Sequence, residues 1–184
     1  MKINTLKICV TAVGIALFVV LSLCLQVPVF ENYYLCLGYM AFAVYCYSFG
    51  TVMGTAVGVF GVVLYCITTG GVRGMPGWAL GNLVIGIVLG LTFRRTKAMR
   101  STVLRAVINT AAILLSVTVG ILLGKSALES VLYTQLLAVR IGKNVYAWAA
   151  DLFVLLLSLP LCMALDRTVQ KMFPKLTSKG SVHE

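Results

Sequence analysis

The stretch from Leu35 to Thr69 contains no charged residue, and this feature constrains the fold more than any other. At a rise of 1.5 Å per residue, the stretch is too long for one membrane span, which needs roughly 20 apolar residues. Similar apolar runs recur along the chain, which is 60% hydrophobic and only 11% charged. Soluble domains carry about 25% charged residues, so the sequence predicts an integral membrane protein. The runs are continuous rather than alternating, which favours helices over a β-barrel.

We expect an all-α bundle of six transmembrane helices in one domain, residues 1–168, followed by a polar, basic tail, residues 169–184. The predicted spans are residues 6–26, 34–48, 50–69, 77–94, 102–124 and 146–167. The second and third spans result from dividing the neutral stretch at "YSFG", Tyr47 to Gly50. The first apolar run is interpreted as a retained span, because no small-x-small cleavage site follows it.

The distribution of basic residues tests this topology. With six spans, eleven of the fifteen Lys and Arg residues fall on the side that holds both termini. The other four are Arg73, Lys125, Arg140 and Lys143. This positive-inside bias predicts that both termini are cytoplasmic. It also accounts for the net charge of +10 without a nucleic-acid partner.

Three outer loops follow from these spans, at residues 26–34, 69–77 and 125–145. The third loop begins with "SALE", Ser126 to Glu129, which has the pattern of a capping box. Apolar residues at helical spacing follow, so we expect an interfacial or lid helix there. Because the longer loops are outside, the outer face is the expected ligand-facing side.

Asp151 is the sharpest candidate for ligand binding, because acids within a membrane span are costly and are often functional. Asn144, Trp148 and Asp151 are spaced i, i+4, i+7 and therefore share one helix face. The alternative is a structural ion pair between Asp151 and Arg140 or Lys143.

Trp78 and Asn82 form a second candidate pair, at i and i+4 near the head of the fourth span. An interhelical hydrogen bond is the alternative for Asn82, and an interfacial aromatic belt is the alternative for Trp78 and the tyrosines. The remaining outer candidates for substrate contact are Glu31, Asn32, Tyr34, Tyr65, Arg73 and Arg140.

Small residues indicate where helices approach closely. In the fourth span, Gly77 and Gly81 lie on one side, and Gly86 and Gly90 lie nearly opposite, so we expect different neighbours at its two ends. The third span carries a glycine face, expected to pack within the bundle, at Gly50, Gly54, Gly58 and Gly61. Periodicity alone leaves two interpretations of Ala12 and Ala16: they pack against a helix of the same chain, or they pack against a partner's helix.

The sequence contains no motif that indicates catalysis or cofactor binding. "GILLGKS", Gly120 to Ser126, has three rather than four residues between its glycines and ends an apolar helix, so it is no phosphate loop. The lone histidine, His183, lies in the tail, and the six cysteines have neither zinc nor disulfide spacing. We therefore expect no enzyme activity, no metal and no cofactor.

Three segments carry a family resemblance: "AVGIA" at Ala12–Ala16, "YSFGTVMGTAVGVFG" at Tyr47–Gly61 and "GWALGNLVIGIVLGLTFRR" at Gly77–Arg95. The order and spacing of these segments resemble those of the substrate-binding S components of energy-coupling factor (ECF) vitamin transporters, particularly the riboflavin-transporter-like group.

The resemblance implies a subunit of the bacterial cytoplasmic membrane that binds a water-soluble vitamin, or a vitamin precursor, at its extracellular face. It implies two kinds of partner, a transmembrane coupling subunit and a pair of ATP-binding-cassette (ABC) ATPases. It also implies that Ala12 and Ala16 contact the coupling subunit. The alternative function is a small secondary transporter or channel that works alone.

Overall fold

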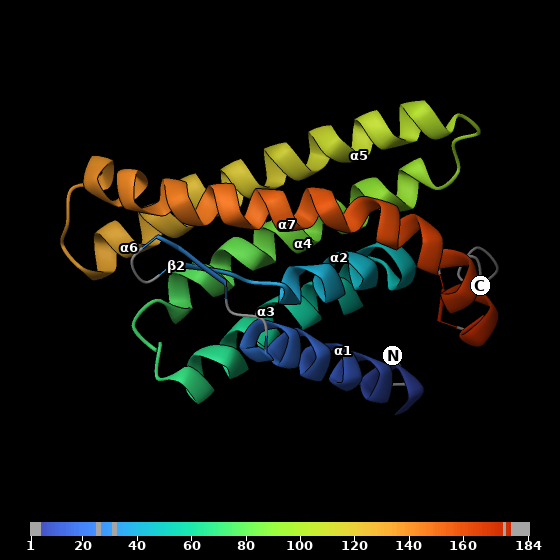
Figure 1. Cartoon of the computed structure of the whole chain (residues 1–184), viewed down its shortest axis with the longest axis horizontal. Helices are drawn as coiled ribbons and strands as arrows, with labels where there is room; N and C mark the ends of the chain where they lie inside the picture. The colour runs from blue at the N-terminus through green and yellow to red at the C-terminus, as the bar shows by residue number, and fades with distance from the viewer. Residues whose placement is uncertain (1–4, 25–26, 31–32, 175, 178–184) are drawn as a thin grey trace.

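The structure is a computed structural model that describes residues 5–24, 27–30, 33–174 and 176–177. Its long helices run side by side along one axis and form a bundle (Figure 1). The helical elements are α1 (Thr5–Cys24), α2 (Gly38–Phe49), α3 (Thr51–Thr69), α4 (Met75–Thr96), α5 (Thr102–Val117), the π-helix η1 (Thr118–Lys125), α6 (Ser126–Leu132) and α7 (Leu137–Met172). Two short strands, β1 (Val27–Phe30) and β2 (Tyr33–Leu35), form a hairpin between α1 and α2.

Five helical segments of the described chain are long and apolar enough to cross a membrane. They are α1, α3, α4, the continuous segment Thr102–Leu132 and α7. The sixth pass contains α2, whose 12 residues rise about 18 Å. The six-helix pattern is therefore confirmed, with one pass that is only partly helical.

The predicted second helix, residues 34–48, begins later than expected. Residues 33–35 form β2, which pairs with β1 in antiparallel register, with Pro28 opposite Tyr34. The segments "VPVF" and "YYL" are rich in β-branched and aromatic residues, which favour strands. Both strands contact α7. Non-helical backbone at membrane depth is tolerated where protein surrounds it or a cavity borders it, and pairing satisfies its polar groups.

The predicted outer loop at residues 125–145 is wrong. The fifth helix continues without a break through η1 and α6 to Leu132, and α7 begins at Leu137 rather than at residue 146. Ser126 caps no helix, because its hydroxyl donates to the backbone carbonyl of Ile121 one turn earlier. The helix expected after Ser126 is present as α6, but it continues the fifth helix instead of standing in an outer loop. The last helix also extends past residue 167, to Met172.

The division of the neutral stretch at "YSFG" is confirmed, since α2 ends at Phe49 and α3 begins at Thr51. Gly50, between them, has a φ angle of +84°, a backbone conformation that glycine adopts without strain. In α3, Gly54 packs against Cys46 and Gly58 packs against Phe42 of α2. The glycine face of this span therefore packs within the bundle, as expected.

The two glycine pairs of α4 contact different neighbours, as the sequence predicts. A Cβ atom at Gly81 would lie 3.1 Å from the backbone oxygen of Gly120 in η1. At Gly86, it would lie 2.8 Å from the Cα atom of Thr55 in α3. Through these close approaches, α4 packs against α3, η1 and α6 at the same time.

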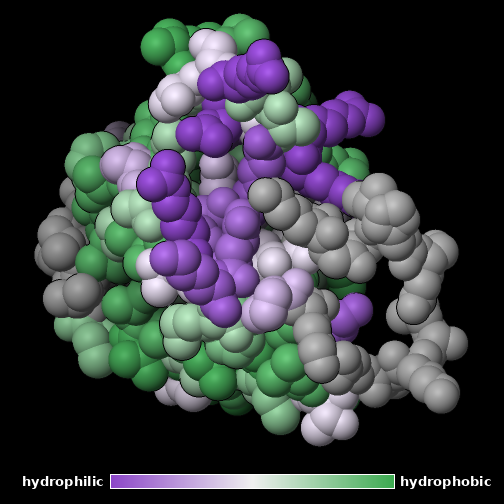
Figure 2. All heavy atoms as spheres, turned by 90° about the vertical axis from the view of Figure 1, so that its right-hand side faces the viewer, coloured by the Kyte–Doolittle hydropathy of each residue, from purple (hydrophilic) through white to green (hydrophobic). Residues whose placement is uncertain are grey.

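The bundle has two distinct ends. We call the end where α4 and α7 begin and α6 lies the α6 end, and the opposite end, where α1 begins and α7 ends, the termini end (Figure 1). At the termini end, hydrophilic residues gather in the middle of the face within a largely hydrophobic rim (Figure 2). Asp166 lies there and forms an ion pair with Lys97, with 2.6 Å between Oδ1 and Nζ.

Candidate ligand-binding site

Hydrogen-bonded side chains link α2, α3 and α4 in the interior of the bundle. Nε1 of Trp78 donates to the hydroxyl of Tyr39 at 2.8 Å, and this hydroxyl donates to Oδ1 of Asn82 at 2.7 Å. Nδ2 of Asn82 donates to the backbone carbonyl of Gly58 at 3.0 Å. Tyr39 and Asn82 are both fully buried. We call Tyr39, Trp78, Asn82 and Asp151 the central cluster.

Asp151 joins the central cluster from α7. Its side chain is buried, and its carboxyl group lies within hydrogen-bonding reach of the Tyr39 hydroxyl. No cation of the described chain lies within ion-pair distance of it, although the charge of Lys125 acts on it. A tyrosine hydroxyl carries one proton and therefore serves either Asn82 or Asp151 at a given moment. The buried acid thus retains capacity to accept a hydrogen bond from a ligand.

A second polar group, the Glu129 cluster, lies between α6 and α7 and consists of Ser126, Glu129, Arg140 and Asn144. Nδ2 of Asn144 donates to Oγ of Ser126 at 2.9 Å and to Oε2 of Glu129 at 3.1 Å. Arg140 forms an ion pair with the same Glu129 oxygen at 3.7 Å. Nε of Arg140 is buried and has no hydrogen-bond partner among the described residues.

The aromatic ring of Tyr133 joins the two turns at the α6 end. The guanidinium carbon of Arg73 lies 5.3 Å from the ring centroid, and that of Arg140 lies 4.8 Å from it. Arg73 belongs to the turn before α4, whereas Tyr133 follows α6. These cation–π contacts therefore hold the α3–α4 turn against the α6–α7 turn.

The π-helix explains how polar residues of the fifth helix reach the interior. In η1, the hydrogen-bonding pattern widens from i+4 to i+5, which changes the direction in which the following residues project. Ser126 and Glu129 are consequently buried at the start of α6. At the other end of η1, Nε1 of Trp148 donates to Oγ1 of Thr118 at 3.1 Å. Wide turns of this kind often occur at functional sites.

Most of the outer residues singled out in the sequence fall into these clusters. Trp78, Asn82 and Asp151 meet around Tyr39, and the ring of Tyr65 lies edge-on to Trp78 with 5.7 Å between the centroids. Arg140 and Asn144 meet at Glu129, while Arg73 contacts Tyr133. Glu31 and Asn32 lie outside the described residues, and for Tyr34 the backbone alone is described.

One structural alternative from the sequence is wrong. Arg140 does not pair with Asp151, because its guanidinium group pairs with Glu129 instead. Lys143 is exposed and forms no ion pair with Asp151. Asp151 also lies deeper than predicted, about 21 Å along α7 from Leu137, because the helix begins earlier than expected.

Sequence reasoning did not select four residues that the structure places in the polar clusters and the adjoining contact, namely Tyr39, Ser126, Glu129 and Tyr133. Tyr39 lies in an aromatic run in which no pattern distinguishes it from its neighbours. Ser126 and Glu129 were interpreted as a capping box in an outer loop, so their burial was not predicted. The one available signal was Glu129 itself, an acid followed by apolar residues at helical spacing.

Ala12 and Ala16 lie on an exposed face of α1, whereas Gly14 is buried against Tyr45 and Val57. An apolar groove of about 320 Å³ runs between α1 and α3 beside Ala12. Its other lining residues are Lys7, Ile8, Thr11, Ile15, Val52, Met53, Ala56 and Phe60. This face contributes little to the packing of the bundle itself.

The fold and the polar clusters define a class: a multi-pass membrane protein with a polar interior at one end of a helical bundle. The family model of the ECF-type riboflavin transporter S component matches residues 2–167. The chain therefore belongs to the family of ECF transporter S components, the substrate-specific subunits of these transporters. No curated protein matches its sequence.

Proposed function

We propose that the chain binds riboflavin, or a similarly flat heteroaromatic vitamin, at its α6 end and delivers it to an ECF-type ABC importer. The observation that carries the proposal is the family match across residues 2–167. The central cluster supports the position of the site, because it combines aromatic rings with a buried acid that has no ion-pair partner among the described residues. The chain itself acts as a binding subunit and performs no catalysis.

The chemistry of the clusters suits such a ligand. Trp78, Tyr65 and Trp148 are aromatic and half-buried, so they offer faces and edges for a flat ring system. Asp151 accepts a hydrogen bond from a ring N–H group, and the unpartnered Nε of Arg140 donates to a ligand oxygen. The hairpin that interrupts the second pass lies beside α7. A pass that is only partly helical is a typical feature of ligand-binding sites in membrane proteins.

The charge distribution gives the orientation of the proposed site. Four basic residues lie between Arg94 and Arg100, at the termini end. By the positive-inside rule, this end faces the cytoplasm and the α6 end faces the outside. The proposed membrane is the bacterial cytoplasmic membrane, where an outward site collects a solute for uptake.

The exposed face of α1 is the proposed contact with the coupling subunit. Ala12 lines the apolar groove between α1 and α3, and Ala16 is exposed one turn further along α1. Small side chains at both positions allow a partner helix to approach closely. The ATP-binding subunits join this assembly through the coupling subunit.

Uptake measurements test this function. Vesicles that contain the chain together with a coupling subunit and both ATPases should take up radiolabelled riboflavin when ATP is inside. Vesicles with the chain alone should bind riboflavin without accumulating it. Accumulation by the chain alone, without ATP, would contradict the proposal and favour a secondary transporter.

A pair of variants tests the partner surface in the same vesicles. Replacing both Ala12 and Ala16 by leucine should abolish co-purification with the coupling subunit and stop uptake, while riboflavin binding stays unchanged. Leu17→Phe is the control, because Leu17 is exposed on α1 about 140° around the helix from Ala12. Normal assembly in the double variant would contradict the assignment of this face.

A further inference from the structure

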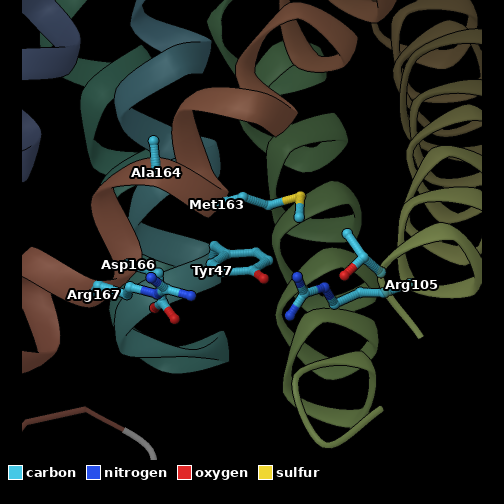
Figure 3. A pocket seen from close by; sticks show the side chains of 7 residues that line it. Tyr47, Arg105, Met163, Ala164, Asp166 and Arg167 are labelled. Carbon is cyan, nitrogen blue, oxygen red and sulfur yellow. The ribbon is translucent and has the colours of Figure 1, made fainter. Parts of the chain in front are cut away.

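A cavity of about 400 Å³ lies at the termini end, far from the central cluster. It is bordered by the first turns of α5, the end of α2 and the last third of α7. Arg105 of α5 points toward Tyr47 of α2, while Asp166 and Arg167 approach from α7 (Figure 3). Thr102, Met163 and Ala164 complete the lining. Nothing in the proposed uptake function uses this cavity.

Among the described residues that line the cavity, Asp166 is the one acid, and it is already neutralised. Oδ1 of Asp166 pairs with Nζ of Lys97 at 2.6 Å, and its Oδ2 accepts from Nε2 of Gln170 at 2.6 Å. The ammonium group of Lys97 also lies over the ring of Tyr47, 4.6 Å from the centroid. Asp166 therefore has little capacity left to balance the two arginines of the cavity.

The two arginines remain uncompensated. Neither Arg105 nor Arg167 forms an ion pair within the described part of the chain. Nε of Arg105 is buried and has no hydrogen-bond partner there either. A buried donor without a partner is costly, so the geometry favours an acceptor in the cavity. Guanidinium groups match the oxygens of phosphate especially well.

The surroundings indicate which phosphate compound fits. Exposed apolar side chains lie within two positions of the lining residues along the chain, namely Val103 and Val107 on α5 and Leu165 on α7. The cavity lies at the end of the bundle where hydrophilic residues gather inside a hydrophobic rim (Figure 2). Basic pockets between transmembrane helices at this level bind the headgroups of anionic lipids.

We infer that this cavity, between α5 and α7, binds the phosphate group of an anionic phospholipid in the leaflet at the termini end. Arg105 contacts the phosphate from the bundle side, and Arg167 contacts it from the exposed side. The acyl chains lie along the apolar surface of α5 and α7. A free phosphate ion shares the headgroup chemistry but would leave this apolar surface unused.

Native mass spectrometry of the purified full-length chain in dodecyl maltoside tests the inference. The probes are dioctanoyl phosphatidylglycerol, dioctanoyl phosphatidylcholine and inorganic phosphate. The wild-type chain should bind phosphatidylglycerol at least about fivefold more tightly than phosphatidylcholine, the effect expected from one arginine near a membrane surface. Inorganic phosphate at the same concentration should not displace the lipid.

Arg105→Gln should remove the preference for phosphatidylglycerol, whereas the control Arg100→Gln should keep it. Arg100 is exposed in the turn before α5 and does not line the cavity, although its loss changes the net charge equally. Should Arg105→Gln fail to fold, as judged by gel filtration, Arg167→Gln decides the question, with a loss of the preference expected. Four results would overturn the inference: no preference in the wild type, a preference that persists in folded Arg105→Gln, equal loss in the Arg100 control, or displacement of the lipid by phosphate.

Discussion

The hydroxyl of Tyr39 donates a hydrogen bond of 2.7 Å to Oδ1 of Asn82, across the buried contact between α2 and α4. This hydrogen bond explains why a transmembrane helix that is rich in glycine carries an asparagine. The amide of Asn82 is satisfied on both sides, because its nitrogen donates to α3. The same hydroxyl lies beside Asp151, so the bond that holds the helices together also borders the proposed ligand site.

A double-mutant cycle measures the energy of this bond. Tyr39→Phe and Asn82→Ala should each lower thermal stability in detergent, because each leaves a buried polar partner unsatisfied. The coupling free energy between the two changes should be about 0.5–1.5 kcal/mol, the range found for hydrogen bonds between membrane helices. Strictly additive effects would contradict the bond.

Asp151→Asn keeps the shape of the side chain and removes its charge. If the acid accepts a hydrogen bond from the ligand, riboflavin affinity should fall about 10- to 100-fold, as expected for a hydrogen bond to a charged group. Quenching of flavin fluorescence measures the affinity. The control is Ser158→Ala, a buried position further along the same helix whose hydroxyl bonds within its own turn. Unchanged affinity in Asp151→Asn would remove Asp151 from the site.

The contact of Arg73 with Tyr133 should slow ligand exchange, because it ties together the two turns above the proposed site. Arg73→Gln removes one cation–π contact, worth about 0.5–1 kcal/mol when exposed, so riboflavin should dissociate about 2–5 times faster. Stopped-flow fluorescence measures this rate. Lys143→Gln, an equal change of charge at an exposed site on α7, should leave it unaltered. Identical rates in both variants would show that the contact does not restrain the turns.

Substitution by alanine should have different effects at the two glycines of η1. A Cβ atom at Gly120 would lie 2.7 Å from the backbone oxygen of Gly81, whereas at Gly124 its nearest neighbour would be an oxygen at 3.4 Å. Gly120→Ala should therefore destabilise the protein by about 1–3 kcal/mol through overpacking. Gly124→Ala should be neutral or should stabilise it by up to about 1 kcal/mol. Thermal unfolding in detergent distinguishes them, and equal stability would contradict the close approach of α4 and η1.

The sequence predicted the features that depend on local periodicity. Hydropathy located the apolar centre of each span but not all the helix ends, and the turn at Gly50 followed from the length of the neutral stretch. The opposite contacts of Gly81 and Gly86 followed from helical geometry. Trp78 and Asn82 were correctly placed on one face, because they are four residues apart and share Tyr39 as a partner.

Features that depend on distant parts of the chain were not predictable in the same way. Ser126 and Glu129 have the local pattern of a helix start in an outer loop. They are instead buried within a continuous helix, because Asn144 of α7 hydrogen-bonds to both and Gly77 of α4 leaves room beside Glu129. No local pattern distinguishes Tyr39 from the other tyrosines of its run. The pairing of Lys97 with Asp166 joins residues 69 positions apart, which no local spacing could indicate.

Native mass spectrometry of the protein as purified shows whether this chain is a vitamin-binding subunit. We expect one bound small molecule per chain, with the mass of riboflavin or a similar vitamin, retained in the wild type and reduced in Asp151→Asn. A chain that carries no ligand as purified, and that binds none after incubation with riboflavin, would rule out this function.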